Sequence, residues 1–347
     1  MVQSRAPLCD PMNVRRTVLL PVLSVSAALV AAFAPVHASA APRTPKPSPR
    51  APKAAPKVAK PIIGIADQKA TMFADTRFRA LGIRVVRLNL RWDVLTEADA
   101  TAALDTWMAG ARQTGARPLI TFDRSPRRPS YNPTPRELAD AMSALRRRYP
   151  GLKEFSTWNE ANLGKRPDIV ARWWLALRKR CPSCTVLAVD LVDAPNMVGW
   201  ARRFVRAAGR KPAVWGLHNY IGMNRRSNAS TRAFLRALPG RVWLTETGGL
   251  VFRNNRSTVV LPASVPHAAS VTKFILGPAV KAAGPRVQRI YLFHWDTGPK
   301  EPPTWDSGFI GPDDQPRPAL DVLARALGRS LPPTPPAAPP AADTPAP

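Results

Sequence analysis

Cysteine and histidine are both scarce in this sequence. Among its 347 residues there are 3 cysteines and 4 histidines. Cys9 lies in an N-terminal segment that we expect to be removed, which leaves only Cys181 and Cys184, in the stretch CPSC. A structural zinc site needs about four ligands, and no histidine is spaced to complete one. We therefore expect no metal and no other cofactor.

The CPSC pair itself has three interpretations. In an exported protein, two cysteines this close can form a small disulfide loop just before a strand. Free thiols are the second interpretation, and a redox-active or metal-binding pair is the third. A thioredoxin-like pair opens a helix, whereas Cys181 and Cys184 precede a predicted strand. We therefore favour a disulfide between them.

Acidic residues are also few. The chain has 51 Lys and Arg against 23 Asp and Glu, which gives a formal net charge of +28. A strongly basic domain is the usual electrostatic sign of nucleic-acid binding. Here, however, the arginines are scattered over predicted helices and are not interleaved with exposed aromatic residues. We therefore expect no nucleic-acid partner, and the charge instead favours anionic envelope polymers, such as cell-wall glycans, or lipid head groups.

The first 40 residues have the pattern of an export signal. An arginine pair precedes the apolar stretch TVLLPVLSVSAALVAAFA, and Ala38-Ser39-Ala40 supplies a small-x-small cleavage site. An uncleaved membrane anchor is the alternative, but Pro21 and the cleavage site argue against it. We expect cleavage after Ala40, membrane contact only through the signal, and a secreted or cell-envelope protein.

Two further segments have too little apolar character to fold. Residues 41–60 are rich in Pro, Ala and Lys, and residues 331–347 are rich in Pro and Ala. Such compositions form extended, solvated chain instead of a packed core. We expect a linker and a disordered tail, with one folded, monomeric domain over residues 61–330.

Within that domain, short apolar stretches alternate with amphipathic ones. The predicted strands are 61–67, 84–90, 117–123, 154–160, 185–191, 213–220, 241–246 and 289–296. The predicted helices are near 72–82, 97–115, 135–149, 168–180, 196–209, 230–238, 265–284 and 318–328. This alternation implies parallel strands joined by helical crossovers. No glycine-rich phosphate turn follows the first strand, which argues against a doubly wound sheet, so we predict a single (β/α)8 barrel.

Polar side chains gather where the predicted strands end. In such a barrel, catalytic side chains come from the carboxyl ends of the strands. Here those ends carry Asn89, Asp123, Glu160, Asp190, His218, Glu246 and Asp296. Glu160 and Glu246 end the fourth and seventh strands, which face each other across the ring. Two carboxylates in one cleft are what glycoside hydrolysis requires, one to donate a proton and one to attack the anomeric carbon.

The motifs around these glutamates resemble those of a known group of enzymes. TWNEAN and WLTETGG are similar to the segments after strand four and at the end of strand seven in clan A glycoside hydrolases, which are retaining (β/α)8 enzymes. RVVRLNLRW, HNY and FHWD resemble further segments of the clan, on strands two, six and eight. The likeness covers essentially all of residues 61–330. Its closest members are the family 39 and the family 5, cellulase-like enzymes.

The resemblance implies roles for individual residues. Glu160 would be the acid/base and Glu246 the nucleophile. Asn159 would bind the sugar 2-hydroxyl. Further substrate-binding side chains would be those of Arg87, His218, Tyr220 and Trp295, the last as the floor of the sugar site.

The sequence departs from the cellulase-like pattern at two positions. Thr121 stands near the place of a strand-three histidine, and Ala161 stands where a proline commonly follows the Asn-Glu pair. These departures weaken a cellulase assignment. We expect an exported retaining glycosidase acting on a carbohydrate, with a non-catalytic carbohydrate-binding or envelope-associated protein on the same fold as the alternative.

Overall fold

A computed structural model describes residues 60–254, 259–298 and 304–333. All of them lie in the second of two units into which the chain divides, residues 56–347. The predicted signal, linker and most of the predicted tail fall outside the described residues and stay predictions.

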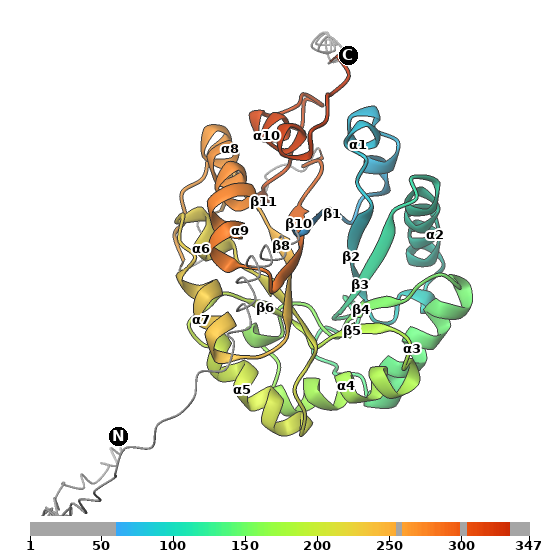
Figure 1. Ribbon diagram of the computed structural model, residues 1–347. Helices are drawn as coiled ribbons and strands as arrows, with labels where there is room; N and C mark the ends of the chain where they lie inside the picture. The colour runs from blue at the N-terminus through green and yellow to red at the C-terminus, as the bar shows by residue number, and fades with distance from the viewer. Residues whose placement is uncertain (1–59, 255–258, 299–303, 334–347) are drawn as a thin grey trace, which may run out of the picture. The chain divides into compact units, whose positions relative to one another are not determined.

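The strands form one sheet that curls into a barrel (Figure 1). They are β1 (Ile62–Ala66), β2 (Val85–Arg91), β3 (Arg117–Asp123), β4 (Glu154–Ser156), β5 (Thr185–Leu187), β6 (Asp190–Val192), β7 (Val214–His218), β8 (Arg241–Thr247) and β10 (Val287–Phe293). Their order in the sheet is β5-β4-β3-β2-β1-β10-β8-β7-β6, and every pairing is parallel. The predicted barrel is therefore confirmed.

The fifth barrel strand is broken into β5 and β6. β5 pairs with β4, whereas β6 pairs with β7. Between them, the backbone N–H of Ala188 donates to Val214 at 3.0 Å, and that of Gly216 donates to Val189 at 2.9 Å. The two ends of the sheet therefore meet around this break, and Asp190 sits where the second piece begins.

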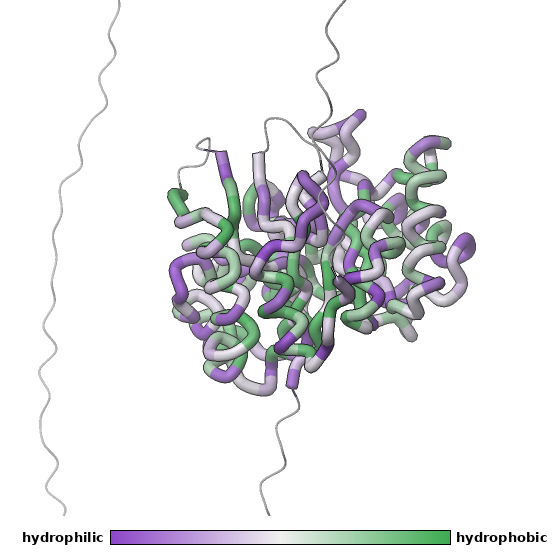
Figure 2. The backbone as a smooth tube through the Cα atoms, turned by 90° about the horizontal axis from the view of Figure 1, so that it is seen from above, coloured by the Kyte–Doolittle hydropathy of each residue, from purple (hydrophilic) through white to green (hydrophobic). Residues whose placement is uncertain are grey.

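Helices lie outside the strands (Figure 1). They are α1 (Thr76–Leu81), α2 (Ala98–Gln113), α3 (Pro135–Arg148), α4 (Pro167–Arg180), α5 (Met197–Ala208), α6 (Tyr220–Asn224), α7 (Ala229–Ala237), α8 (Val265–Phe274), α9 (Val280–Ala283) and α10 (Pro318–Leu327). Hydrophobic and hydrophilic residues alternate along the outer helices, as a half-buried helix requires (Figure 2). Within the described residues, no helix has both the length and the apolar character needed to cross a membrane.

Local sequence signals explain where individual helices begin. Thr134 and Glu137 form a capping box at the start of α3: the Thr134 hydroxyl accepts from the Glu137 N–H, and the Glu137 carboxylate accepts from the Thr134 N–H. Such a box satisfies two backbone N–H groups that the helix leaves free. The Asp75 carboxylate caps α1 by accepting from the N–H of Arg77. The start of α3 agrees with the predicted helix near 135–149, whereas α1 begins at Thr76, later than the predicted start near 72.

The interior of the barrel has a small apolar cluster of its own. It consists of Ala66, Val85, Leu119, Leu187, Val214, Trp243 and Tyr291, with Phe293 packed against it. Below this cluster, at the amino ends of the strands, Arg289 binds both carboxylate oxygens of Glu154 at 2.5 and 2.7 Å. Arg289 also stacks over Trp243, 3.7 Å from the ring centroid, and donates to the Tyr291 hydroxyl. These contacts fill the lower end of the barrel interior, and a second group of polar side chains lies at the carboxyl ends of the strands above.

Candidate active site

Arg87 is the centre of the polar group at the upper end of the barrel. It comes from β2, its side chain is fully buried, and it donates to three strands. Its guanidinium binds Glu246 Oε1 at 2.5 Å, Asp190 Oδ2 at 2.8 Å and Asn159 Oδ1 at 2.9 Å. Its Nε donates to the Thr121 hydroxyl at 3.0 Å. The structure thus brings Arg87, Asn159 and Glu246 together, as the sequence predicted.

Asp190 is the part of this group for which the sequence suggested no role. Its carboxylate is fully buried and accepts from Arg87, from the Thr121 hydroxyl at 3.0 Å and from the Ser156 hydroxyl at 2.7 Å. Burial alone would raise the pKa of Asp190, but the charge of Arg87, the hydrogen bond and charge of His218 and the hydrogen bond of Ser156 hold it well below its usual value. A Cβ atom at Gly216 would lie only 1.8 Å from Asp190 Oδ1, so the glycine provides the room for this carboxylate.

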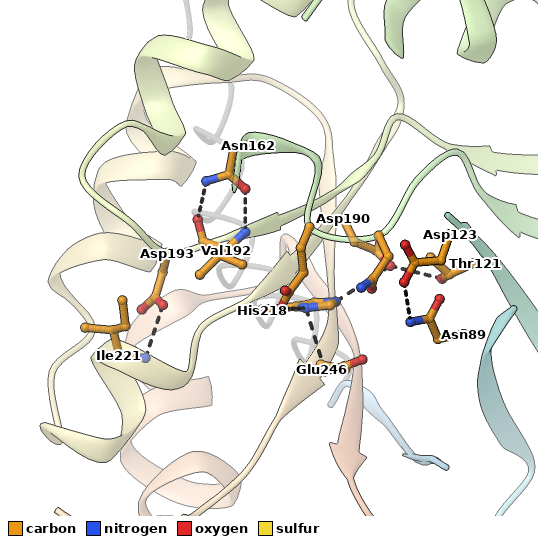
Figure 3. A network of polar contacts seen from close by, with 12 residues as sticks. Asn89, Thr121, Asp123, Asn162, Asp190, Val192, Asp193, His218, Ile221 and Glu246 are labelled. Carbon is orange, nitrogen blue, oxygen red and sulfur yellow. Dashed lines mark hydrogen bonds and ion pairs between the residues drawn. The ribbon is translucent and has the colours of Figure 1, made fainter. Parts of the chain in front are cut away.

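Glu246 lies near the end of β8, with only 10% of its side chain exposed. One carboxylate oxygen binds Arg87, and the other lies 3.7 Å from His218 Nδ1. Figure 3 shows the His218 ring beside Glu246, with Asp190 on its other side. The carboxylate is therefore held between a guanidinium and an imidazole.

Glu160 lies near His218 and Glu246, but it is a loop residue and not part of a strand. β4 ends at Ser156, four residues earlier than Glu160, and the predicted strand over 154–160 is therefore too long. Glu160 adopts the left-handed conformation, with φ 44° and ψ 40°, which is uncommon for a residue with a side chain. Its side chain, 35% exposed, accepts a hydrogen bond from His218 Nδ1 at 3.0 Å when the imidazole carries its proton there.

His218 holds a proton under ordinary conditions. Burial alone would lower its pKa, but the charge of Glu246 and the hydrogen bonds to Asp190 and Glu160 outweigh burial and raise the pKa of His218 to about 9. For Glu160 the balance is similar. Burial would raise its pKa, whereas the hydrogen bond and charge of His218, together with Arg87, lower the pKa of Glu160 below its usual value.

Two polar side chains, the amide of Asn162 and the carboxylate of Asp193, hold the backbone next to Glu160 and His218 (Figure 3). Asn162, two residues after Glu160, donates to the Val192 carbonyl at 3.0 Å and accepts from its N–H at 2.8 Å. Asp193 accepts from the N–H groups of Ile221 at 3.1 Å and Gly222 at 2.7 Å, in the short helix α6 that follows His218. The second asparagine of TWNEAN therefore positions the loop that bears Glu160.

Glu160, His218 and Glu246 together form one compact cluster. One atom from each, two carboxylate oxygens and a ring nitrogen, lie within 4.8 Å of one another. Among the described residues, this is also the group that could ligate a metal ion. A metal ligand must be a neutral imidazole, whereas the raised pKa of His218 keeps it protonated. The hydrogen bond between His218 and Glu160 gives this cluster a path for proton transfer, and binding of a metal would require His218 to lose its proton.

Asn159 and Tyr220 border this cluster. The Asn159 Oδ1 atom is used by Arg87, and its Nδ2 has no hydrogen-bond partner among the described residues, which leaves it available to a ligand. The Tyr220 ring, 6% exposed, packs edge-on against Trp305 with centroids 4.8 Å apart. Burial raises the pKa of Tyr220 well above its usual value, and the charges of Glu246 and Glu160 act in the same direction.

The structure separates Trp295 from the other predicted site residues. Its indole is 1% exposed, packs against Phe78 of α1 at 5.4 Å and donates to Asp75 at 2.9 Å. Phe293, two residues earlier, packs against the cluster inside the barrel and is only half-buried. Of the two aromatic residues of FHWD, Phe293 is therefore the one that packs at the inner rim, and the role of Trp295 as the floor of a sugar site stays a prediction.

A cavity of about 410 Å³ opens beside Glu160. Its walls include Asp123 and Arg124 at the end of β3, and Trp158, Asn159 and Lys165 around the Glu160 loop. On another part of the rim, β9 (Phe252–Arg253) and β11 (Trp305–Asp306) form a short antiparallel ribbon that carries the exposed Phe252. The acid cluster thus has a concave, polar approach next to Glu160.

Cys181 and Cys184 lie away from this cavity, between α4 and β5. They are joined by a disulfide, with Cα atoms 5.3 Å apart. The bond closes the turn that follows α4.

Comparison with known proteins shows likeness in fold and not in sequence. No family model matches the chain, and no curated protein matches it. A family 39 glycoside hydrolase from the gut symbiont Bacteroides cellulosilyticus has a TM-score of 0.52 and 15% identity, over 77% of this chain and 64% of the other. The present chain thus spans less than two thirds of that enzyme.

Two other solved structures give a similar result. A glucosidase from Croceicoccus marinus has a TM-score of 0.59 and 12% identity, over 78% of this chain and 67% of the other. The catalytic core of a xylanase A has a TM-score of 0.56 and 13% identity, over 78% of this chain and 99% of the other. Likeness at such low identity concerns the fold alone. The chain is therefore a (β/α)8 barrel that resembles, distantly, those of glycoside hydrolases.

Proposed function

We propose that this protein is a retaining glycoside hydrolase that cleaves O-glycosidic bonds of a poly- or oligosaccharide. The observation that carries the proposal is the proximity of two carboxylates, with an oxygen of Glu160 and one of Glu246 within 4.8 Å of each other. Retaining enzymes hold their two carboxyl groups about 5–5.5 Å apart, whereas inverting enzymes need about 6.5–9.5 Å to admit a water. The observed spacing favours retention.

In the first step, Glu246 attacks the anomeric carbon. Its partner Arg87 is a permanent cation, which suits a group that must be ionised to act as a nucleophile. The bond to the leaving oxygen breaks as Glu160 gives that oxygen a proton, and a glycosyl ester forms on Glu246. In the second step, Glu160 takes a proton from water, and the hydroxide so formed displaces Glu246 and regenerates the free carboxylate.

His218 supplies the proton that Glu160 must deliver. In the free protein the proton resides on His218, hydrogen-bonded to Glu160 at 3.0 Å. Burial is the largest influence on the Glu160 carboxyl and favours its neutral form. A bound sugar excludes more water and strengthens that influence. The proton then moves from His218 Nδ1 to Glu160 as the substrate binds, which leaves a neutral imidazole.

Asn159 and Phe293 complete the proposed sugar site. The free Asn159 Nδ2 can donate to a sugar hydroxyl while Arg87 fixes the other end of the amide. We assign it to the 2-hydroxyl, whose hydrogen bonds strengthen in the transition state. The half-buried ring of Phe293 can pack against the apolar face of a sugar.

Chemical rescue and trapping test the mechanism. Activated fluoro-sugars should label Glu246, as shown by peptide mass mapping. With azide as an external nucleophile, Glu246→Ala should give a glycosyl azide of inverted configuration and Glu160→Ala one of retained configuration. A label on another residue, or rescue with the two configurations exchanged, would remove the assigned roles. A wild-type protein that binds oligosaccharides but turns over none would be a carbohydrate-binding protein instead.

We further propose that the chain is exported, because residues 1–40 have the pattern of a cleaved signal. The mature protein should begin at Ala41 and be found in the envelope or the medium. N-terminal sequencing of the protein recovered from cell fractions tests this, and a mature chain that keeps residues 1–40 in the cytoplasmic fraction contradicts it.

A further inference from the structure

The cavity beside Glu160 contains a lysine with no acidic partner. Lys165 is half-buried, and its ammonium donates to the neutral Asn132 side-chain oxygen at 2.6 Å. No carboxylate lies within ion-pairing distance of it among the residues that the structure describes. Burial lowers the pKa of Lys165, and nearby Arg124 acts in the same direction, against the charge of Asp123. A partly desolvated cation of this kind gains from an anionic partner.

The position of Lys165 is built into the fold. Its N–H donates to the Ala161 carbonyl at 2.8 Å, and its own carbonyl accepts from the Trp200 indole at 2.8 Å. Its ammonium lies 5.2 Å from the centroid of the Trp158 ring, which is itself stacked on Trp173. Because the backbone is held on both sides and the ammonium is placed over a fixed ring, Lys165 presents its charge at a defined point of the cavity.

Arg124 adds a second available cation to the same cavity. The other arginines of this loop are engaged: Arg127 pairs with Glu97 at 2.9 Å, and Arg128 lies over the Tyr131 ring. The Arg124 guanidinium, by contrast, is exposed and has no hydrogen bond or ion pair to a described residue. Two cations without an ion-pair partner among the described residues therefore lie on the wall of the cavity that Glu160 also lines.

The cavity belongs to the leaving-group side of the proposed reaction. Its lining includes Glu160 and Asn159, the residue assigned above to the 2-hydroxyl, whereas Glu246 is absent from it. The cavity therefore extends from the point of cleavage, on the side of the proton donor. The group that donates the proton faces the oxygen that leaves, and the nucleophile faces the sugar that stays. A ligand in the cavity is therefore part of the leaving half of the substrate.

We propose that the leaving sugar carries an anionic group, a carboxylate or a sulfate ester, and that Lys165, assisted by Arg124, binds it. This inference rests on the proposed hydrolase function and defines its substrate class. A single cation suits a carboxylate or sulfate as a point charge. The site thus selects glycans that contain uronic acids or sulfated sugars.

Matched substrates test the inference. A uronic-acid oligosaccharide is compared with its carboxyl-reduced, neutral form, and a sulfated oligosaccharide with its desulfated form. For the wild-type mature protein, kcat/KM should be about tenfold or more higher for one anionic member than for its neutral partner, since a hydrogen bond to a charged group is worth about 1.5–3 kcal/mol. The preferred pair identifies the anion. Added salt should reduce the preference.

Variants locate the effect. Lys165→Met should bring the anionic-to-neutral ratio of kcat/KM close to one, and Arg124→Gln should lower it by a smaller factor. Lys179→Met, an exposed lysine at the far end of α4, is the matched control and should keep the wild-type ratio. Equal rates for both members of each pair, or an unchanged ratio in Lys165→Met, would overturn the inference while leaving the hydrolase proposal intact.

Binding measurements separate the two proposals. The same pairs are titrated into Glu246→Gln, which should bind without turnover. If no glycan is cleaved by the wild type but the anionic member still binds more tightly and loses this advantage in the Glu246→Gln, Lys165→Met double variant, the anion site stands and the hydrolase proposal fails. If neither turnover nor binding distinguishes the members, the anion site is wrong.

Discussion

The two ends of the barrel interior each contain an arginine bound to a glutamate, and they differ in what else is present. At the lower end, Arg289 and Glu154 form a two-point pair, and Arg117 adds a second cation 3.6 Å from Glu154 Oε1. At the upper end, Arg87 is shared between the two buried carboxylates of Asp190 and Glu246. The carboxylate of the lower group is matched by cations, whereas the two carboxylates of the upper group share one guanidinium.

The excess of acid at the upper end explains its other features. Arg87 faces Asp190 and Glu246 directly, and Glu160 adds a third carboxylate within the same cluster. The protonated His218 supplies the second cation, and its raised pKa is a direct consequence of the surrounding negative charge. The ion pair of the lower end serves the stability of the fold. The excess of negative charge at the upper end keeps a proton on His218, next to carboxylates that can exchange it.

The largest expected effect comes from removing the charge of one glutamate at each end. Glu246→Gln should reduce kcat by more than about a thousandfold, because the nucleophile is lost. Glu154→Gln at the lower end should keep kcat per folded molecule and lower the free energy of unfolding by roughly 2–4 kcal/mol, since it leaves Arg289 without its charge partner. Kinetics and denaturant unfolding of both variants measure this. A reduced kcat in Glu154→Gln would contradict the view that the lower end affects stability alone.

Replacing Arg87 at the upper end should reduce the free energy of unfolding more than replacing Arg289 at the lower end. Arg87→Met removes the shared arginine of two buried carboxylates, Asp190 and Glu246. After Arg289→Met, in contrast, the single carboxylate of Glu154 still lies 3.6 Å from Arg117. Arg87→Met should therefore lose roughly 3–5 kcal/mol and the lower variant less. Urea unfolding at neutral pH gives both values. At lower pH, where carboxylates can take up protons, the defect of Arg87→Met should shrink. Equal losses in the two variants would contradict the charge imbalance described here.

His218 should make stability depend on pH. Its pKa rises from an ordinary value of 6.5 to about 9 in the folded state. A group with a raised folded-state pKa contributes stability that is complete below its unfolded pKa and is lost as the pH rises through the folded value. The free energy of unfolding should therefore fall by up to roughly 3 kcal/mol between pH 6.5 and 9.

The control for this prediction is His218→Gln, which keeps hydrogen-bonding groups but cannot be protonated. Its unfolding free energy should be flat over the same pH range, apart from changes shared with the wild type. The groups that face His218 are Glu160, Asp190, Glu246 and Arg87. A wild-type stability that does not decline toward pH 9 would contradict a protonated His218.

Most of the fold could be predicted from the sequence because strand and helix signals alternate strongly. All eight predicted strands and eight predicted helical regions correspond to elements of the structure. The break between β5 and β6 could not be predicted, since residues 185–191 have the composition of one continuous buried strand. The break arises from the closure of the ring, which places the two pieces against different neighbours.

The candidate site could be predicted as far as its acidic pair and Arg87, because residues at strand ends converge in a barrel. Asp190 was visible as a polar strand end, but its role depends on Gly216 leaving space for it, which is a contact between strands far apart in the sequence. Phe293 could not be distinguished from Trp295, since the choice depends on which side chain points inward where β10 ends. The role of Asp190 and the choice between Phe293 and Trp295 thus depend on contacts between strands and on side-chain direction, which residue type alone does not reveal.

The left-handed backbone of Glu160 has a consequence for how this position tolerates change. Residues with a Cβ atom are disfavoured by roughly 1–2 kcal/mol in this conformation, and glycine is not. Both Glu160→Ala and Glu160→Gly remove the carboxylate. The free energy of unfolding of the glycine variant should nevertheless be about 1 kcal/mol larger than that of the alanine variant, whereas alanine is the more stabilising residue at most positions. Equal stabilities would contradict the observed φ of 44°. The protein thus keeps at this position a residue that selection for stability alone would discard.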